Sequence, residues 1–316
     1  MPVDAFAGLS DQLILGSVLF YIASMIGFAL DLAYGKAQSG TPAKAQLKQL
    51  VAAGDRSGAT AIETPPPVAS APEPPAWALR AGRVAIVLGW AGCLANLGAI
   101  ITRGLAVDRW PWGNMYEFVV AICFAAVTAF LTTQLRDNVR FLGAFVMVTA
   151  VLGLGFAVKF LYTAAGPVMP ALNSYWIAIH VSAAILASGL FIVAGVAGIL
   201  YLLRGDNLSR LPARTDLESV AHKAIVLAFP VWTFAVIAGA MWADKAWGRY
   251  WGWDPKEIWA FITWVAYAAY LHARVTAGWR GKAATIVQLA AFGCLLFNLI
   301  GVNIFLGGLH SYAGVE

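Results

Sequence analysis

The sequence predicts an all-α, polytopic integral membrane protein with about eight transmembrane helices. Of its 316 residues, 60% are hydrophobic and only 12% are charged, whereas a soluble domain carries about 25% charged residues. The apolar residues gather in runs of roughly 20, the length that a helix needs to cross the hydrocarbon core of a bilayer. The net charge of +5 gives no reason to expect a nucleic-acid partner, so the expected surroundings are lipid.

Eight apolar runs account for the expected helices. In chain order they cover residues 13–33, 83–103, 115–135, 140–162, 175–203, 222–243, 257–277 and 284–306. The fifth run is longer than the hydrocarbon core requires, so that helix would tilt or project beyond the membrane. Cys93, Cys123 and Cys294 lie far apart within apolar runs, and we interpret them as packing residues.

The distribution of Lys and Arg predicts the orientation in the membrane. With the N-terminus outside, 15 of these residues fall in inner segments and 6 fall in or near outer ones. Because inner loops carry the excess of Lys and Arg, both termini are expected outside. The loop between the sixth and seventh runs is expected on the same side.

The chain divides into three predicted parts. Residues 1–33 form an outer tail and an appended helix. Residues 34–82 form a cytoplasmic linker that is basic and then rich in proline, with six prolines between residues 64 and 76, which favours a semi-extended tether. Residues 83–316 form the transmembrane core, which includes a tryptophan-rich loop at 242–259.

That loop is the most unusual stretch of the sequence, because residues 241–264 hold six of the 13 tryptophans. Trp and Tyr gather at both membrane surfaces in any case, so an interfacial aromatic belt is one interpretation. The alternation of rings and charges in Trp251-Gly252-Trp253-Asp254-Pro255-Lys256-Glu257 favours another. Since Trp prefers a site with one apolar and one polar side, this pattern indicates a platform for a flat, partly charged ligand.

Two of the four histidines are expected beside this loop. His180 lies near the outer end of the fifth run, and His310 follows the eighth run, also outside. Two imidazoles that converge over an aromatic platform would supply both axial ligands of a planar iron macrocycle. His272 is expected in the inner part of the membrane, about 22 Å along its helix from Glu257, where an ionisable residue is a functional candidate. The alternative for each is a hydrogen bond to a neighbouring helix, which we favour for His222 at the inner surface.

Two further outer segments, 108–117 and 166–176, are dense in unusual residues. Within the first, Glu117 is expected just inside the third run. A carboxylate at the membrane edge normally has a partner, and Arg109 is the nearest candidate.

Several of these motifs resemble one family. The run Trp247-Gly248-Arg249-Tyr250-Trp251-Gly252-Trp253-Asp254-Pro255-Lys256-Glu257 resembles the WWD signature of the haem-handling proteins of cytochrome c maturation. Residues 270–274 are similar to the CcsA (ResC) branch, which belongs to the pathway known as System II. The resemblance covers about residues 83–313 and includes the segments 112–117, 170–182, 301–303 and 308–313.

The resemblance implies a role for each candidate residue. His180 and His310 match two external histidines that hold haem iron above the membrane. His272 matches a membrane histidine that forms an inner haem site with the partner protein CcsB (ResB). The implied cofactor is haem b with two axial imidazoles. The tryptophan-rich loop is implied to bind it, with the candidate residues Trp247, Trp251, Trp253, Asp254 and Arg249.

The implied function is that of the haem-binding membrane subunit of the System II cytochrome c synthase, a cytochrome c haem lyase complex. It would carry haem to the outer face of the cell's inner membrane, rather than of a thylakoid, and position it for thioether attachment to the CxxCH motif of apocytochrome c. Thiol-reducing proteins would be indirect partners. No catalytic side chain is required, because the protein's contribution is to place vinyl groups against thiols and to set the iron ligation. Arg249, Lys245 and Lys256 could each pair with the haem propionates, and the sequence does not choose among them.

Three alternatives remain at this level. A haem transporter or chaperone would deliver haem without taking part in attachment, and sequence alone does not separate it from a synthase. An ion or solute carrier with His272 and Glu117 on a proton path is disfavoured, since we find no inverted repeat and no pair of broken helices. A purely structural subunit is disfavoured by the charged tryptophan-rich loop.

Overall fold

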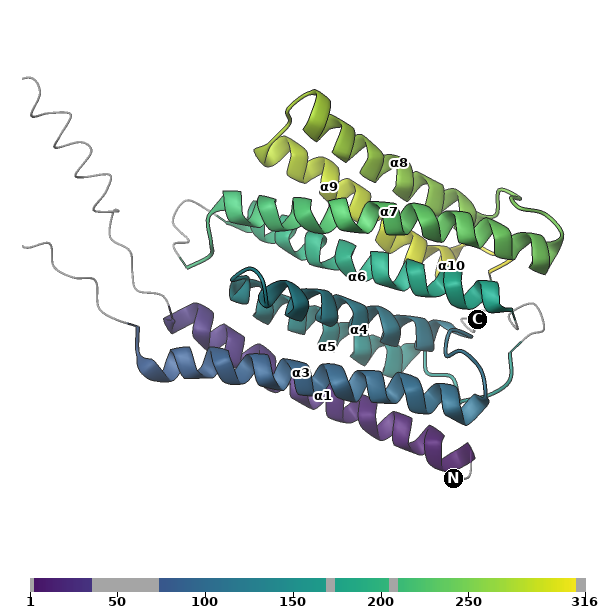
Figure 1. Cartoon of the computed structure of the whole chain (residues 1–316), viewed down its shortest axis with the longest axis horizontal. Helices are drawn as coiled ribbons and strands as arrows, with labels where there is room; N and C mark the ends of the chain where they lie inside the picture. Colours follow the sequence, from purple (N-terminus) through teal and green to yellow (C-terminus); the bar gives the residue numbers. More distant parts are fainter. Residues whose placement is uncertain (1–2, 36–73, 169–173, 205–209, 311–316) are drawn as a thin grey trace, which may run out of the picture.

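The protein is a bundle of long helices (Figure 1). The computed structural model describes residues 3–35, 74–168, 174–204 and 210–310, and every regular element in these ranges is helical, which confirms the predicted fold class. The helices are α1 (Val3–Tyr34), α3 (Ala76–Val107), α4 (Met115–Gln134), α5 (Gly143–Phe160), α6 (Tyr175–Leu203), α7 (Arg214–Trp247), α8 (Pro255–Thr276), α9 (Gly281–Leu296) and α10 (Val302–Phe305). The 3-10 helix η1 (Arg140–Leu142) precedes α5, and the π-helix η3 (Phe297–Gly301) separates α9 from α10.

Seven helical segments of the described chain are long and apolar enough to cross a membrane, so the protein is a multi-pass membrane protein. They coincide with seven of the eight predicted spans. The predicted span 257–277 is also a helix, α8, with 22 residues, but it is not among these seven. The reason is its composition, because it carries Lys256, Glu257, His272 and Arg274. It nevertheless lies alongside α7 and α9 in the bundle (Figure 1).

The predicted linker at 34–82 falls mostly outside the described residues. Its last part, from Ala76, is already the start of α3, which continues without interruption to Val107. The helix therefore begins before the predicted apolar run, which starts at residue 83, and ends after it, since that run stops at residue 103.

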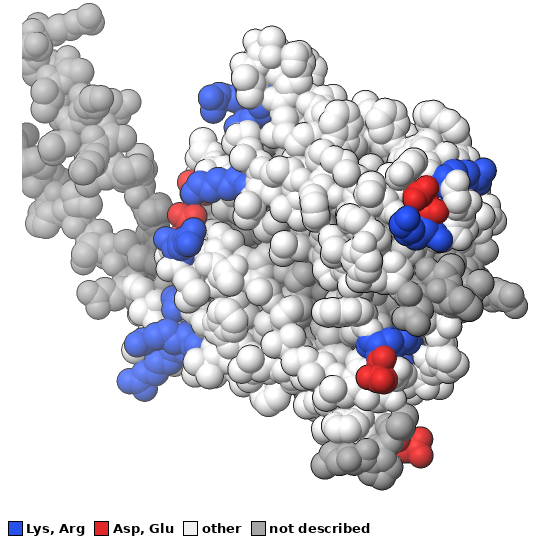
Figure 2. Space-filling view, turned by 45° about the vertical axis from the view of Figure 1, so that its right-hand side comes forward, with Lys and Arg blue, Asp and Glu red and all other residues white. Residues whose placement is uncertain are grey.

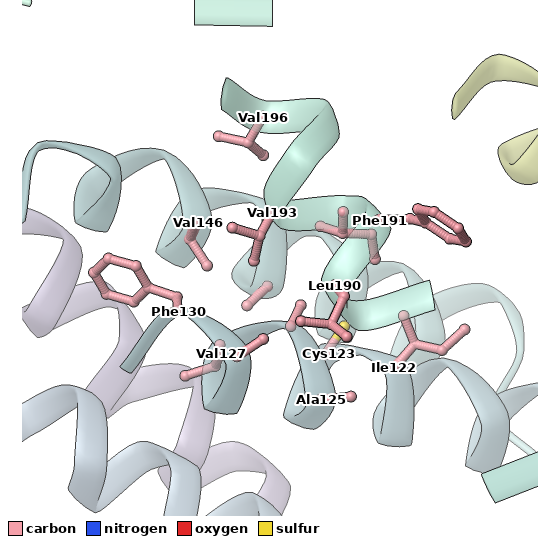
Figure 3. Packing of buried hydrophobic residues seen from close by; sticks show 14 of the residues in the cluster. Ile122, Cys123, Ala125, Val127, Phe130, Val146, Leu190, Phe191, Val193 and Val196 are labelled. Atoms are coloured by element: carbon pink, nitrogen blue, oxygen red, sulfur yellow. The ribbon is translucent and has the colours of Figure 1, made fainter. Parts of the chain in front are cut away.

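α4 and α6 form the centre of the bundle. α4 packs against α5 and α6, and α6 also packs against α7 and α9, so this pair joins the first helices to the last. Figure 3 shows the buried aliphatic and aromatic side chains at this contact, among them Val127 of α4 and Val193 of α6. The backbones approach closely at Gly189, where a Cβ would lie 2.7 Å from the backbone carbonyl carbon of Ala125. Small residues allow such close approach between membrane helices.

A repeated hydrogen bond joins α1 to α3. Three serine hydroxyls of α1 donate to backbone carbonyl oxygens of α3 over 2.9, 3.0 and 2.7 Å; the pairs are Ser10 with Ala99, Ser17 with Gly92, and Ser24 with Ala85. Donors and acceptors both recur every seven residues, the period of helices that pack side by side along a seam. Because each hydroxyl is satisfied across the seam, the serines cost little inside an apolar bundle.

Charged side chains gather at the two ends of the bundle (Figure 2). On the face that Figure 2 shows, the surface between these ends is almost entirely uncharged, as a surface in contact with lipid should be. At one end, Arg140 lies 3.8 Å from Asp31 and Arg210 donates to the carbonyl of Ala33, so both basic residues contact the end of α1. This is the end that we predict to face the cytoplasm.

A buried carboxylate holds the opposite end together. Glu117, in the first turn of α4, accepts hydrogen bonds from Nε of Arg103 at 3.1 Å, from Nη1 of Arg109 at 2.9 Å and from the N–H of Gly113 at 2.8 Å. The predicted pair of Glu117 and Arg109 is confirmed, and Arg103 is a second partner. Arg109 also donates to the carbonyl of Gly166 at 3.1 Å, which ties the segment after α5 to the same carboxylate.

Replacing Gly189 by valine tests the central contact. The new side chain would press on the backbone of Ala125, and such overpacking costs about 1–3 kcal/mol. We expect Gly189→Val to lower the apparent melting temperature of the detergent-solubilised protein, followed by tryptophan fluorescence. Gly155→Val is the matched control, because a Cβ at Gly155 meets no atom within 4 Å. Equal melting temperatures in the two variants would contradict the contact between α4 and α6.

Candidate functional site

Two carboxylates shape the tryptophan-rich loop between α7 and α8. After α7 the chain turns at Gly248, which has a left-handed conformation with φ of 71° that favours glycine. Asp254 caps the start of α8, and Pro255 is its first residue, a combination typical of helix N-termini. Glu257 completes a capping box by accepting from the N–H groups of Gly252 at 2.8 Å and Asp254 at 3.0 Å.

The carboxylate of Asp254 also holds the segment that follows α10. Its Oδ1 accepts from the N–H of Leu309 at 2.6 Å, and its Oδ2 accepts from Nδ1 of His310 at 2.9 Å. Gly308 permits this approach, because a Cβ there would lie 2.5 Å from Oδ1. Burial raises the pKa of Asp254, but the hydrogen bonds from His310 and Leu309 more than offset it and leave the pKa below its usual value. The ionised carboxylate therefore orients the His310 ring.

α6 and α7 orient His180. It lies in the second turn of α6, and its Nδ1 is 2.8 Å from the carbonyl oxygen of Ala235 on α7. A carbonyl oxygen only accepts, so Nδ1 carries the proton and the neutral ring has its lone pair on Nε2. Gly239, one turn further along α7, faces the ring, and a Cβ there would lie 2.7 Å from Cε1 of His180. The ring is thus fixed by a hydrogen bond and by the absence of a side chain at residue 239.

His180 and His310 line the same cavity at the end of the bundle that carries Glu117. The Trp242 ring is adjacent to both: it stacks on His180 with centroids 6.1 Å apart and meets His310 edge-on at 5.9 Å. Trp247 meets His310 edge-on at 5.2 Å. Further indoles in the lining are Trp112, Trp232 and Trp251. The structure therefore brings the two histidines together with part of the tryptophan-rich loop.

A lysine also lines this cavity. Nζ of Lys256 donates to the backbone carbonyl oxygen of Asn298 at 2.6 Å and to the side-chain Oδ1 of Asn303 at 3.2 Å. Burial of the ammonium group lowers the pKa of Lys256 to about 7, and the nearby charge of Asp254 offsets this only in part. The cavity thus has an indole and aliphatic lining with the amino group of Lys256 on one wall.

Besides Asp254, which contacts His310 from outside the lining, three other candidates do not line the cavity. Trp253 is 66% exposed and meets Trp251 edge-on at 5.8 Å. The guanidinium of the exposed Arg249 folds over Gly252, where a Cβ would lie 2.6 Å from its Cζ. His272 lies near the far end of α8, and its side chain is exposed on the isolated chain. Trp253 and Arg249 therefore belong to the rim of the loop, and His272 belongs to a different place on α8.

His222 lies near the start of α7, with Nδ1 3.4 Å from the hydroxyl of Tyr270 on α8. One turn earlier, Glu218 forms an ion pair with Arg274 of α8 and accepts from the N–H of Gly281 at 3.1 Å. These contacts join α7 to α8 and α9. They agree with the hydrogen-bonded, structural role that we favour for His222.

The cavity also contains residues that the sequence does not single out as ligands. Trp112 and Asn303 belong to segments that resemble the family, so a signal for them exists in the sequence. No sequence motif points to Trp232, because it lies within a long apolar run, where a tryptophan is expected to be a packing residue. It reaches the cavity because α7 turns that face toward α8, where Trp232 Nε1 donates to the carbonyl of Ala260 at 3.3 Å.

The cavity lining is largely aromatic and apolar, and it includes two imidazoles. In the described part of the chain, no group of three or more His, Cys, Asp or Glu side chains could hold a bare metal ion. Two imidazoles are sufficient for a metal that already has four ligands from a macrocycle. Aromatic and apolar walls with a few polar groups are typical of cofactor-sized sites. The donor set therefore fits an iron porphyrin with two axial histidines.

Comparison with known proteins finds similarity to cytochrome c assembly proteins. A family model described as Cytochrome C assembly protein matches residues 112–310, which include both cavity histidines. The cytochrome c biogenesis protein CcsA of Gloeobacter violaceus is 30% identical over 280 residues, covering 69% of this chain and 83% of the relative. The CcsA protein of Synechococcus elongatus is 31% identical over 285 residues, covering 71% of this chain and 87% of the relative. The CcsA protein of Chlamydomonas reinhardtii is 33% identical over 238 residues, covering 72% of this chain and 67% of the relative.

The burial of Lys256 predicts a pH dependence of stability. Its pKa falls from 10.5 to about 7 on folding, so the unfolded chain binds more protons than the folded chain between these values. The free energy of unfolding should therefore rise with pH across this window. We expect the apparent melting temperature of the wild type, minus that of Lys256→Met, to rise from about pH 7 to about pH 10. Lys245→Met, at an exposed lysine, should keep the wild-type slope; a constant difference between the wild type and Lys256→Met would contradict a buried ammonium group.

Proposed function

The chain belongs to the CcsA family of cytochrome c assembly proteins and has a role in cytochrome c maturation, and we propose that in this role it binds haem and positions it for attachment to apocytochrome c. The protein would be the haem-binding subunit of a System II cytochrome c synthase. The observation that supports this most is the single cavity lined by His180, His310 and the tryptophan-rich loop.

His180 and His310 would hold the haem iron from its two faces. In each ring Nδ1 makes a hydrogen bond to an oxygen: that of His180 to the backbone carbonyl of Ala235, and that of His310 to the carboxylate of Asp254. Hydrogen bonds of this kind fix the orientation of a ligating imidazole and raise its basicity, with Nε2 as the ligand atom. Trp247 and its neighbours in the lining would contact the face of the porphyrin.

Attachment adds the two thiols of a CxxCH segment across the two vinyl groups of haem b. In each addition, sulfur bonds to one vinyl carbon and hydrogen to the other, so no oxidant or reductant is consumed. The chain would contribute position, because the histidines and the cavity wall hold the vinyl groups where the thiols arrive. The histidine of the CxxCH segment would then replace one of the two axial imidazoles.

The exposed His272 supports a second, inner haem site shared with another protein. Its side chain faces outward from α8, so an imidazole from a partner could complete the axial pair, and we assign that ligand to CcsB. α8 would then link the two sites, with His272 near one end and the capped, cavity-lining start at the other. Haem would pass from the inner site to the cavity, which we place on the extracytoplasmic face of the cell's inner membrane.

Removing either cavity histidine tests the proposal. We expect His180→Gly or His310→Gly to lose the absorption spectrum of haem with two axial imidazoles and to stop maturation of a reporter cytochrome c. Added imidazole should restore both in part, because the missing side chain leaves room for it. His222→Gly is the control and should keep the wild-type spectrum. Full maturation and an unchanged spectrum in both cavity variants would overturn the ligand assignment.

Gly239→Ala tests how His180 is positioned. A methyl group at residue 239 would displace the imidazole, so we expect weaker haem binding and an altered spectrum. Gly293→Ala is the control, since a Cβ there meets no atom within 4 Å. In His180→Gly with haem binding restored by imidazole, Gly239→Ala should cause no further loss, because the free imidazole is not tethered to α6 and can move away from the added methyl group. A further loss of similar size would show that Gly239 acts by another route.

A further inference from the structure

Lys256 is a buried basic residue that takes no part in the proposed iron ligation. It lines the cavity of His180 and His310, and its two hydrogen-bond acceptors, the carbonyl oxygen of Asn298 and Oδ1 of Asn303, are both neutral. A charge removed from water is costly unless an opposite charge compensates for it. The nearby charge of Asp254 compensates the ammonium form of Lys256 only in part, so a ligand that brings a carboxylate into this cavity would gain an attraction that the two neutral acceptors do not supply.

A local change of helix geometry fixes the place of this ammonium group. The chain forms a π-helix at Phe297–Gly301, a widened turn that occurs often at functional sites, and the carbonyl of Asn298 lies within it. The amide of Asn303 is held by its own hydrogen bonds, since Nδ2 donates to the carbonyl of Leu299 at 2.7 Å and to Sδ of Met115 at 3.1 Å. Lys256 Nζ is thus anchored between two fixed oxygens on one wall.

The other cations of the tryptophan-rich loop are placed differently. The side chain of Lys245 is 65% exposed and lies 3.5 Å from a carboxylate oxygen of Asp244. Arg249 is exposed and folds over Gly252. Neither is in the cavity lining, in which Lys256 is the single Lys or Arg within the described residues. Glu257 also lines the cavity, but its Oε2 is engaged by the N–H groups that close the loop.

We propose that Lys256 binds one propionate carboxylate of the porphyrin and so fixes how the macrocycle is rotated within the cavity. This inference rests on the proposed function, because it requires the porphyrin to be held by His180 and His310. Two axial imidazoles leave the macrocycle able to turn about the axis that joins them. An ion pair at its edge removes that freedom.

The rotation matters for the chemistry because haem b is not symmetric. Its two propionates lie along one edge and its two vinyl groups on the remaining sides of the ring. When the propionate edge is held at Lys256, the vinyl groups point away from the wall formed by η3 and α10. Lys256 would thus act as a positioning residue that presents the vinyl groups to the incoming thiols in one orientation.

The test compares two probes, one with ionised propionates and one in which both propionates are neutral methyl esters. The full-length protein, purified in detergent, is titrated with haem b and with haem b dimethyl ester, which has no free carboxylate. We expect Lys256→Met to weaken the binding of haem b by about 10- to 100-fold, the range for a hydrogen bond to a charged group, and to leave the affinity for the ester unchanged or higher. Lys245→Met, the same substitution at an exposed lysine, should bind both probes as the wild type does.

The ester also reports whether the variant is folded, so each outcome decides. If Lys256→Met weakened the binding of both probes equally, the proposal would be overturned, and Lys256 would have only a structural role in the cavity wall. Unchanged affinity for both probes would overturn it as well. Weakening of haem b alone in Lys245→Met would assign the propionate to the loop surface instead. Failure of the wild type to bind either probe would overturn the proposed function itself, and this inference with it.

Discussion

The carboxylate of Asp254 is the group on which the cavity of His180 and His310 depends. It caps the first turn of α8, and it binds the N–H of Leu309 and the ring of His310, which stand 55 and 56 residues further along the chain. One charged side chain therefore joins the tryptophan-rich loop, α8 and the segment after α10. An ionised carboxylate makes stronger hydrogen bonds than a neutral acceptor, and the bonds that it receives keep it ionised although it is buried.

The same rule governs the other polar groups of the bundle. Buried charges in a membrane protein are costly and need partners, and the structure supplies them locally. Glu117 accepts hydrogen bonds from two guanidinium groups and a backbone N–H, while the serine hydroxyls of α1 donate to backbone carbonyl groups of α3. These contacts hold the loops at one end of a bundle whose apolar centre is formed by α4 and α6. A cavity between such fixed elements is suited to a rigid, planar ligand.

α8 carries several of the candidate functional groups, whereas the two cavity histidines come from α6 and from the segment after α10. It has the capping carboxylates and Lys256 at its start and His272 near its end, and these residues explain why it is less apolar than the other long helices. In the function that we propose, each group has a separate task. The histidines of the cavity set the axial ligands, Lys256 sets the rotation of the macrocycle, and His272 marks the inner site that the partner completes.

The sequence by itself determined the helical membrane fold, seven of the eight predicted spans, the pair of Glu117 with Arg109 and the family, because apolar runs and short motifs are local properties of the chain. The seven-residue spacing of Ser10, Ser17 and Ser24 was also present in the sequence, but its acceptors are backbone carbonyls of another helix and leave no mark there. Only the tertiary structure decided that Lys256, and neither Lys245 nor Arg249, lines the cavity, and that Trp253 faces outward. These facts depend on the direction in which a loop folds between two helices, and hydrogen bonds between residues far apart in the sequence set that direction.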